Sequence, residues 1–275
     1  MSLIRVDEQK CNRTGACAAV CPVGILEFDP ESGPAVIRGG AQFCIACGHC
    51  VAVCPHGALD NVRAPLKDQQ PLPAFPVVDP ETAFLFLRSR RSIRNYRPER
   101  VPRERITRLL EAARYAPSGH NFQGLGFIVL EGRKDIEAVS AMVADWMRGE
   151  VAAGSELSRR YHFADVVRAC EEGHDRILRG APHLVVATAA VENPAAQITT
   201  SLALEYVELY AAALGLGTCW AGYVNMFSLQ SPRMAQFLNI PEDRAITGNM
   251  MVGIPEFRYH RLPERDPLEV SWFRG

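Results

Sequence analysis

The stretch FCIACGHCVAVCPHGAL, residues 43–59, contains four cysteines at short, regular spacings. The stretch KCNRTGACAAVCPVGIL, residues 10–26, is a second copy of it at a constant offset of 33 positions. The corresponding positions are Cys11 and Cys44, Cys17 and Cys50, Cys21 and Cys54, Pro22 and Pro55, Gly15 and Gly48, and Gly24 and Gly57. Two copies of one short cysteine-rich unit predict a pseudo-symmetric pair of metal sites.

The distribution of cysteines favours metal binding over disulfides. Seven of the nine cysteines fall between Cys11 and Cys54, and the N-terminal stretch MSLIRVDEQK lacks the features of a secretory signal. We therefore expect a cytoplasmic protein, in which such a cluster holds metal. Tetrahedral zinc is the alternative, but seven cysteines cannot complete two four-thiolate sites and the spacing is not that of a zinc finger.

The second copy, C-x2-C-x2-C-x3-C-P, resembles the bacterial two-cluster ferredoxins, in which the fourth cysteine ligates the other cluster. The resemblance implies that one [4Fe–4S] cluster is held by Cys44, Cys47, Cys50 and Cys21. It implies that the other cluster is held by Cys11, Cys17 and Cys54. Threonine stands at position 14, the partner position of Cys47, and a hydroxyl is a poor iron ligand. This cluster is therefore expected to be [3Fe–4S], or [4Fe–4S] with a non-cysteine ligand near Thr14, and the two potentials should differ.

Three segments are predicted along the chain: a two-cluster ferredoxin domain at 1–63, a proline-rich linker at 64–80 and a second domain at 81–275. The second domain has about 195 residues, enough for a substantial core. Helices are predicted at 81–88, after Pro102 and from 196 to about 215, the last with apolar residues nearly all round it. Strands are predicted at 126–130, 183–189 and 250–254. The mixture predicts an α+β fold.

Charge argues against nucleic acid and membrane partners. The formal net charge is -1, and the longest apolar stretch, 198–216, contains two glutamates. The arginine-dense run RSRRSIRNYRPERVPRER, residues 88–105, ends in a helical pattern, but its first part is not periodic. In that part Arg90, Arg91, Ser92 and Arg94 can direct several donors at one phosphate.

Residues 82–275 resemble the nitroreductase family in the order of three motifs. These are RRSIR at 90–94, APS at 116–118 with Asn121 and Gln123, and LGLGTCW at 214–220; the tail YHRLPERDP at 259–267 resembles that family's last segment. The resemblance implies an α+β flavoprotein fold, one FMN per subunit and an intertwined homodimer with sites at its interface.

The same resemblance assigns the flavin-binding residues. Arg90, Arg91 and Ser92 would bind the FMN phosphate and ribityl end, and Arg265 would close the phosphate site. Arg94 would lie near the pyrimidine edge, and Asn121 and Gln123 would bond the ring or ribityl chain from the other subunit. The full expected set is Arg90, Arg91, Ser92, Arg94, Pro117, Ser118, Asn121, Gln123, Cys219, Trp220, Ala221, Gly222 and Arg265. No protein residue is expected to be catalytic, because the flavin N5 carries the chemistry.

These features predict an FMN-dependent, nitroreductase-like oxidoreductase. Electrons from a low-potential protein or NAD(P)H would pass through the clusters to FMN and on to a nitro, quinone or activated-alkene acceptor. An alternative is an electron-transfer or redox-sensing module without a dedicated small-molecule substrate. A third is a flavin enzyme whose clusters are only structural.

Overall fold

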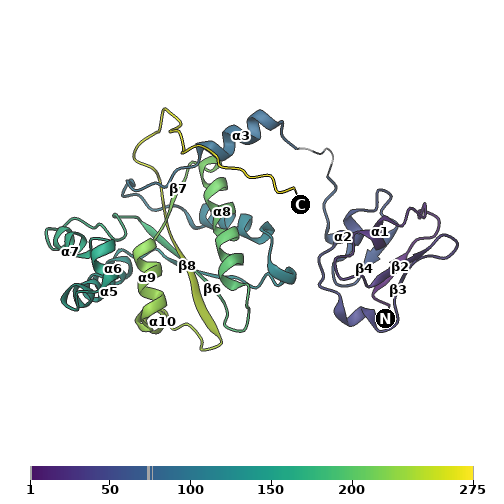
Figure 1. Cartoon of the computed structure of the whole chain (residues 1–275), viewed down its shortest axis with the longest axis horizontal. Helices are drawn as coiled ribbons and strands as arrows, with labels where there is room; N and C mark the ends of the chain where they lie inside the picture. The colour runs from purple at the N-terminus through teal and green to yellow at the C-terminus, as the bar shows by residue number, and fades with distance from the viewer. Residues whose placement is uncertain (1, 73–74, 76, 275) are drawn as a thin grey trace. The chain divides into compact units, whose positions relative to one another are not determined.

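The computed structural model describes residues 2–72, 75 and 77–274, and it divides them into two compact units (Figure 1). The first comprises the described residues of Met1–Val78 together with Gly119–Phe122; the second comprises those of Asp79–Ser118 and Gln123–Gly275. The predicted linker at 64–80 includes positions 73, 74 and 76, which lie outside the described residues. The remainder of it contains a short 3-10 helix, η2 (Leu66–Asp68), and the first residue of α3 (Pro80–Ser89).

The first unit is built from two pairs of short strands. Strand β1 (Ile4–Val6) pairs antiparallel with β4 (Leu59–Asn61), and β2 (Leu26–Asp29) pairs antiparallel with β3 (Gly33–Val36). Helices α1 (Ala16–Ala19) and α2 (His49–Ala52) begin 33 positions apart, and η1 (Gly40–Phe43) precedes the second cysteine run. A small core that includes Ile25, Val51 and Leu59 joins these elements.

The sequence repeat is also a repeat of backbone geometry. Gly15 and Gly48 cap α1 and α2, and both have a φ of 73°. Two residues earlier in each copy, Arg13 and Ala46 have φ values of 53° and 54°. Left-handed φ values are uncommon for residues other than glycine, so their recurrence at matched positions shows that both copies form the same tight loop.

The second unit contains a four-stranded sheet in the order β5-β6-β8-β7. The strands are β5 (Gly126–Leu130), β6 (His183–Ala190), β7 (Gly217–Trp220) and β8 (Arg244–Gly253), and neighbours pair antiparallel. The helices are α3, α4 (Arg103–Glu111), α5 (Arg133–Ala152), α6 (Glu156–Arg160), α7 (Phe163–Glu171), α8 (Ala196–Ala213), α9 (Gly222–Gln230) and α10 (Arg233–Phe237). Two 3-10 turns, η3 (Ala112–Tyr115) and η4 (Gly119–Asn121), follow α4. The three predicted strands are confirmed, although β8 starts six residues earlier, at Arg244 rather than Met250.

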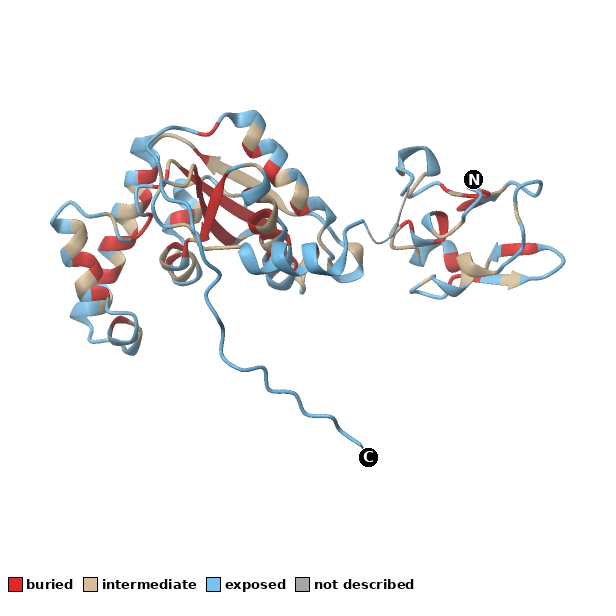
Figure 2. Ribbon diagram, turned by 90° about the horizontal axis from the view of Figure 1, so that it is seen from above, coloured by how far each residue is buried: buried red, intermediate tan, exposed pale blue. Residues whose placement is uncertain are grey.

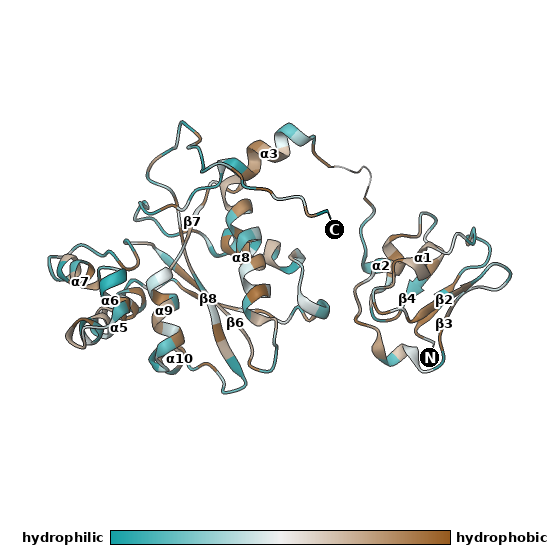
Figure 3. Ribbon diagram, viewed as in Figure 1, coloured by the Kyte–Doolittle hydropathy of each residue, from teal (hydrophilic) through white to brown (hydrophobic). Residues whose placement is uncertain are grey.

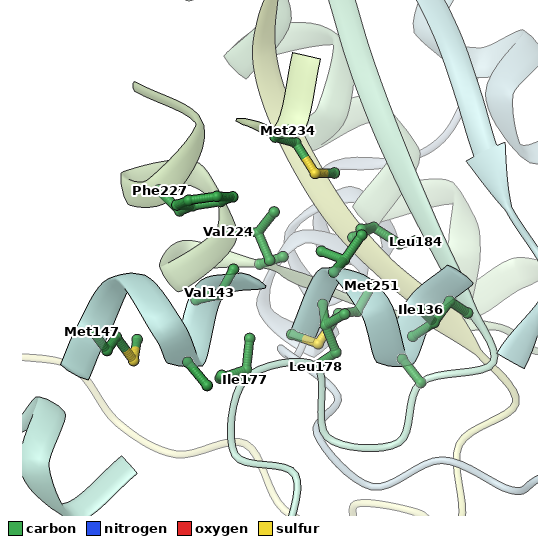
Figure 4. Packing of buried hydrophobic residues seen from close by; sticks show 14 of the residues in the cluster. Ile136, Val143, Met147, Ile177, Leu178, Leu184, Val224, Phe227, Met234 and Met251 are labelled. Atoms are coloured by element: carbon green, nitrogen blue, oxygen red, sulfur yellow. The ribbon is translucent and has the colours of Figure 1, made fainter. Parts of the chain in front are cut away.

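Both faces of this sheet are buried. Leu184 and Val186 of β6 pack into a core with α5, α7, α9 and α10 (Figure 4). Val185 and Ala187, which alternate with them along the strand, pack into a second core with α4 and α8. The period of two along a strand sends alternate side chains to opposite faces, so the sheet is the central layer of the unit (Figure 2).

Helix α8 is less buried than its sequence suggested. One face is buried and contains Thr199, Thr200, Ala203, Leu204, Val207, Glu208 and Ala211. Ile198, Leu202 and Tyr206, spaced four residues apart, form an exposed stripe with 68%, 39% and 41% of their surface accessible. Although the sequence has apolar residues nearly all round this helix, the sheet covers only one of its faces within a single chain. Helix α3 similarly has no buried residue, although its C-terminal half is hydrophobic (Figure 3).

The C-terminal segment 262–274 contains neither helix nor strand and is exposed (Figure 2). Trp272 lies in this segment and is 86% exposed within the single chain. Within the described parts of the chain, no helix has both the length and the apolar character needed to cross a membrane.

Candidate functional site

The seven N-terminal cysteines lie around two separate cavities in the first unit. The Cys44 cavity is lined by four of them, Cys21, Cys44, Cys47 and Cys50. The Cys11 cavity is lined by the other three, Cys11, Cys17 and Cys54, and by Thr14. This is the same division that the ferredoxin resemblance implies, with the threonine where a fourth thiolate is missing. Soft thiolate donors in such sets suit iron–sulfur clusters.

Hydrogen-bond donors point at several of these sulfur atoms. The backbone N–H of Ala58 donates to Cys54 Sγ at 3.2 Å. The side-chain Nδ2 of Asn61 donates to Cys44 Sγ at 3.8 Å and to Cys50 Sγ at 3.7 Å. Burial raises the pKa of the Cys50 thiol, and the Asn61 hydrogen bond opposes that rise. Such donors stabilise negative charge on sulfur, which is the form that binds iron.

In the second unit, the arginine-dense turn lies directly against β7. Ser92 forms an isolated parallel bridge with Thr218, and the Ile93 N–H donates to the Thr218 carbonyl at 2.8 Å. A Cβ on Gly217 would lie 2.6 Å from Ile93 Cγ1, closer than real Cβ atoms approach other side chains. The glycine therefore permits this close approach, which brings two of the predicted flavin-binding segments together.

The guanidinium of Arg91 has an unused donor. Its Nη1 donates to the carbonyls of Arg88 and Arg90 at 2.9 Å and 2.6 Å. Its Nη2 is buried and has no hydrogen-bond partner among the described residues. Buried polar atoms are nearly always hydrogen-bonded, so this atom is suited to an anionic oxygen from a bound group, such as a phosphate.

Arg90 is held differently, by two carboxylates of α8. Its Nε lies 3.7 Å from Glu205 Oε1, and its Nη1 lies 3.7 Å from Glu208 Oε2. Thr218 Oγ1 donates to the other Glu208 oxygen at 3.4 Å. Burial raises the pKa of Glu208 to about 7, although the nearby Arg90 charge opposes the rise. Glu208 was not among the residues predicted from the sequence. The feature that could have indicated it is the presence of a carboxylate among the apolar residues of a long helix.

The segment 219–222, predicted to line the flavin ring, joins the end of β7 to the start of α9. The Ala221 N–H donates to the Asn249 carbonyl at 2.8 Å. Asn249 is fully buried; its Nδ2 donates to Asn225 Oδ1 at 2.8 Å, and its Oδ1 has no partner among the described residues. Cys219 is buried, and burial raises the pKa of its thiol, so it is a packed rather than an activated cysteine.

Arg94 lines a large open groove of about 1180 Å³, and Arg179 lines it too. The charges of both arginines act to lower the pKa of the Cys219 thiol against the effect of burial, which places positive charge near the end of β7. Arg179 has a left-handed φ of 56°. Arg179 was not included in the expected flavin-binding set, because it lies far from the recognised motifs and outside any helical or strand pattern.

The loop predicted to contact the flavin has unusual backbone geometry. His120, Asn121 and Gln123 have φ values of 49°, 56° and 51°. Such conformations are costly and cluster at functional sites. Ser118 Oγ accepts a hydrogen bond from the Gln123 N–H at 3.0 Å, which ties the two ends of the loop.

Asn121 belongs to the first compact unit, where its Nδ2 donates to the carbonyls of Ile45 and Ala46 at 2.9 and 3.1 Å. Arg265 lies in the exposed C-terminal segment, where its N–H donates to Glu264 Oε1 at 3.0 Å. The flavin contacts of Asn121, Gln123, Pro117 and Arg265 therefore stay predictions.

The fold and these residues together define an oxidoreductase in which a ferredoxin-type unit with two thiolate-lined cavities is joined to an α+β unit of the flavin-reductase type. The chain belongs to the nitroreductase family, whose family model matches residues 87–254. Residues 10–58 match the 4Fe-4S dicluster domain.

Similar proteins agree with this assignment. A protein of Thermus thermophilus described as NADH dehydrogenase is 28% identical over 208 residues, which are 68% of this chain and 94% of that protein. A nitroreductase with bound FMN from Desulfitobacterium hafniense has a TM-score of 0.56 and 23% identity, covering 72% of this chain and all of that one. A nitroreductase with bound FMN from Bacteroides fragilis has a TM-score of 0.54 and 21% identity, covering 68% of this chain and 97% of its own. The two structures show that the second unit has the nitroreductase fold.

Proposed function

We propose that the protein is an iron–sulfur flavoprotein that passes electrons from two ferredoxin-type clusters to FMN and on to a small-molecule acceptor. The observation that carries the proposal is the division of seven cysteines between two cavities in a chain of the nitroreductase family. The acceptor class is nitro compounds, quinones or activated alkenes.

Each cavity offers ligands for one cluster. Around the Cys44 cavity, four thiolates would complete a [4Fe–4S] cluster. Around the Cys11 cavity, three thiolates and Thr14 leave one iron without a cysteine, so this cluster is [3Fe–4S] or has a non-cysteine ligand. The thiolates fix the clusters, and the surrounding N–H donors set how readily each accepts an electron.

The arginine-dense turn and the end of β7 would hold FMN. The unpaired Nη2 of Arg91 would bind the phosphate, with Ser92 beside it. Arg94 and Arg179 would place positive charge where reduced flavin is negative, and backbone groups of 219–222 would border the ring. When bound, FMN supplies the chemistry, since it accepts electrons singly and delivers a hydride equivalent from N5.

The electron donor would be a low-potential protein or NAD(P)H. The description of the Thermus relative as NADH dehydrogenase supports the nicotinamide route. The density of cysteines supports a reducing compartment, the cytoplasm.

A homodimer is supported by two apolar surfaces of the second unit. One is the exposed stripe of Ile198, Leu202 and Tyr206 on α8, and the other is the C-terminal segment with Trp272 and Phe273. Contiguous apolar surfaces of this kind mark protein interfaces.

The test is anaerobic purification followed by quantification of iron, sulfide and flavin, and then steady-state turnover with nitro and quinone acceptors. We expect bound FMN, iron and sulfide in amounts that match two clusters, and turnover. Zinc in place of iron, or absence of flavin, would overturn the proposal. Bound cofactors without turnover of any acceptor would favour an electron-transfer or sensing role.

A pair of cysteine variants tests whether the clusters feed the flavin. Cys47→Ser removes a thiolate of the Cys44 cavity, whereas Cys170→Ser changes a partly buried cysteine of α7 outside both cavities. We expect Cys47→Ser to retain FMN but to slow flavin reduction by a one-electron donor, and Cys170→Ser to behave as the wild type. Equal flavin reduction in both variants would mean that the clusters are only structural.

A further inference from the structure

Besides the difference between Thr14 and Cys47, the two halves of the first unit differ at another position beside the cavities. Asn61 is the last residue of β4, and Phe28 occupies the corresponding place in β2, 33 positions earlier. Asn61 lines the Cys44 cavity and is 3% exposed, whereas Phe28 lines the Cys11 cavity. Since the loops and helices around them repeat, this substitution is a further chemical difference between the two cavities.

The orientation of the Asn61 amide is fixed by its neighbours. The Arg63 N–H donates to Asn61 Oδ1 at 2.9 Å, and a backbone N–H can only donate. The Nδ2 group must therefore face the other way, where it lies 3.8 Å from Cys44 Sγ and 3.7 Å from Cys50 Sγ. One buried amide thus donates to two thiolates of the same cavity.

Phe28 provides no such donor to the Cys11 cavity. Its Cδ1 lies only 3.0 Å from the place where a Cβ on Gly15 would be, so the ring packs against the start of α1. The ring also lines the Cys11 cavity. The corresponding positions therefore present an amide NH2 group to the Cys44 cavity and a hydrocarbon ring to the Cys11 cavity.

We propose that Asn61 is a positioning residue that raises the reduction potential of the cluster held in the Cys44 cavity. Reduction adds one electron and no proton, so the negative charge shared by iron, sulfide and the thiolate sulfurs increases by one unit. Hydrogen bonds to those sulfurs are stronger when the charge is larger, and they therefore favour the reduced state. The inference rests on the clusters of the proposed function and is independent of the missing thiolate at Thr14.

A purely structural role is the competing explanation. Asn61 also holds the turn that follows β4, because its Oδ1 accepts from Arg63 and its carbonyl accepts from the Ala64 N–H at 3.0 Å. Both bonds use oxygen atoms, which aspartate retains. Asn61→Asp therefore keeps the turn and removes the donor, whereas Asn61→Leu removes both the acceptor and the donor.

The experiment is a redox titration of the full chain under anaerobic conditions, with titanium(III) citrate as reductant and electron paramagnetic resonance as readout. The signal of the Cys44-cavity cluster is identified as the one altered in Cys47→Ser. We expect Asn61→Leu to lower the equilibrium constant for its reduction about tenfold, a 59 mV fall for one electron. Asn61→Asp should lower it at least as far, because a carboxylate repels the added charge. Phe28→Leu should leave this signal unchanged.

Several outcomes decide the matter. A wild-type potential in Asn61→Asp would overturn the inference and assign Asn61 to the turn alone. If the Leu variant does not retain iron, Asn61→Ser, whose short side chain cannot reach both sulfurs, is titrated in its place with the same expected fall. Wild-type protein without iron and sulfide would instead end the proposed function, so the two failures are distinguishable.

Discussion

Replacing Glu208 by glutamine should change how stability depends on pH. Glu208 lies on the buried face of α8, with its side chain 3% exposed and 3.7 Å from Arg90. Burial raises the pKa of this carboxyl from 4.5 to about 7. The folded protein therefore binds the proton more tightly than the unfolded chain, and stability falls as pH rises from about 4.5 to about 7 and then levels off.

The magnitude follows from the shift. About 2.5 pKa units at 1.36 kcal/mol each give an upper limit of roughly 3.4 kcal/mol in the free energy of unfolding. The Arg90 side chain beside Glu208 is partly exposed to solvent, which screens the charge of the carboxylate. We therefore expect a smaller change in the free energy of unfolding, about 2 kcal/mol. Glutamine is neutral at every pH, so the stability advantage of Glu208→Gln over the wild type should grow steadily from pH 5 and reach about 2 kcal/mol at pH 8.

The assay is urea denaturation at pH 5, 6, 7 and 8, with unfolding monitored by circular dichroism. Both proteins are kept at the same FMN concentration, because bound ligand adds stability. Glu205→Gln is the matched control, since Glu205 is the other carboxylate beside Arg90 but its side chain is 47% exposed. Its stability should follow the wild type across the series. Parallel curves for wild type and Glu208→Gln would refute the reasoning.

Three further outcomes are expected. Gly217→Ala should cost about 1–3 kcal/mol in denaturation, because its Cβ would collide with Ile93, whereas Gly222→Ala, with no atom within 4 Å of its Cβ, should be nearly neutral. Arg91→Lys should raise the dissociation constant for FMN about tenfold in a fluorescence titration, because lysine cannot reproduce the planar fork of donors. An unchanged constant would mean that Arg91 does not bind the phosphate. Leu202→Glu, in the exposed stripe of α8, should shift the protein from dimer to monomer in light scattering, and an unaltered mass would place the interface elsewhere.

Much of this organisation follows from local patterns. The strands β5 and β6 were predictable because their apolar runs are bounded by turns, and the two cysteine groups because three ligands of each set lie on one short loop. Strand β7 was not predicted, since four residues carry too little periodicity. Even so, the motif that contains it was recognised.

The parts that could not be predicted depend on contacts between distant segments. Ser92 meets Thr218 through sheet assembly, and the pairing of Arg90 with Glu208 exists only once α8 is packed. The proposed role of Asn61 likewise depends on where the folded chain places its side-chain amide, beside Cys44 Sγ and Cys50 Sγ. The individual flavin contacts remain predictions.

The two copies of the N-terminal repeat exchange one cysteine each. Cys21, from the first copy, borders the Cys44 cavity, and Cys54, from the second copy, borders the Cys11 cavity. Under the proposed assignment of ligands, neither half can complete its own cluster site, and the last thiolate of each site arrives only when the other half has folded. Assembly of the two centres should consequently be all-or-none, so that oxidative damage to one of these crossing sulfurs endangers both inorganic groups at once.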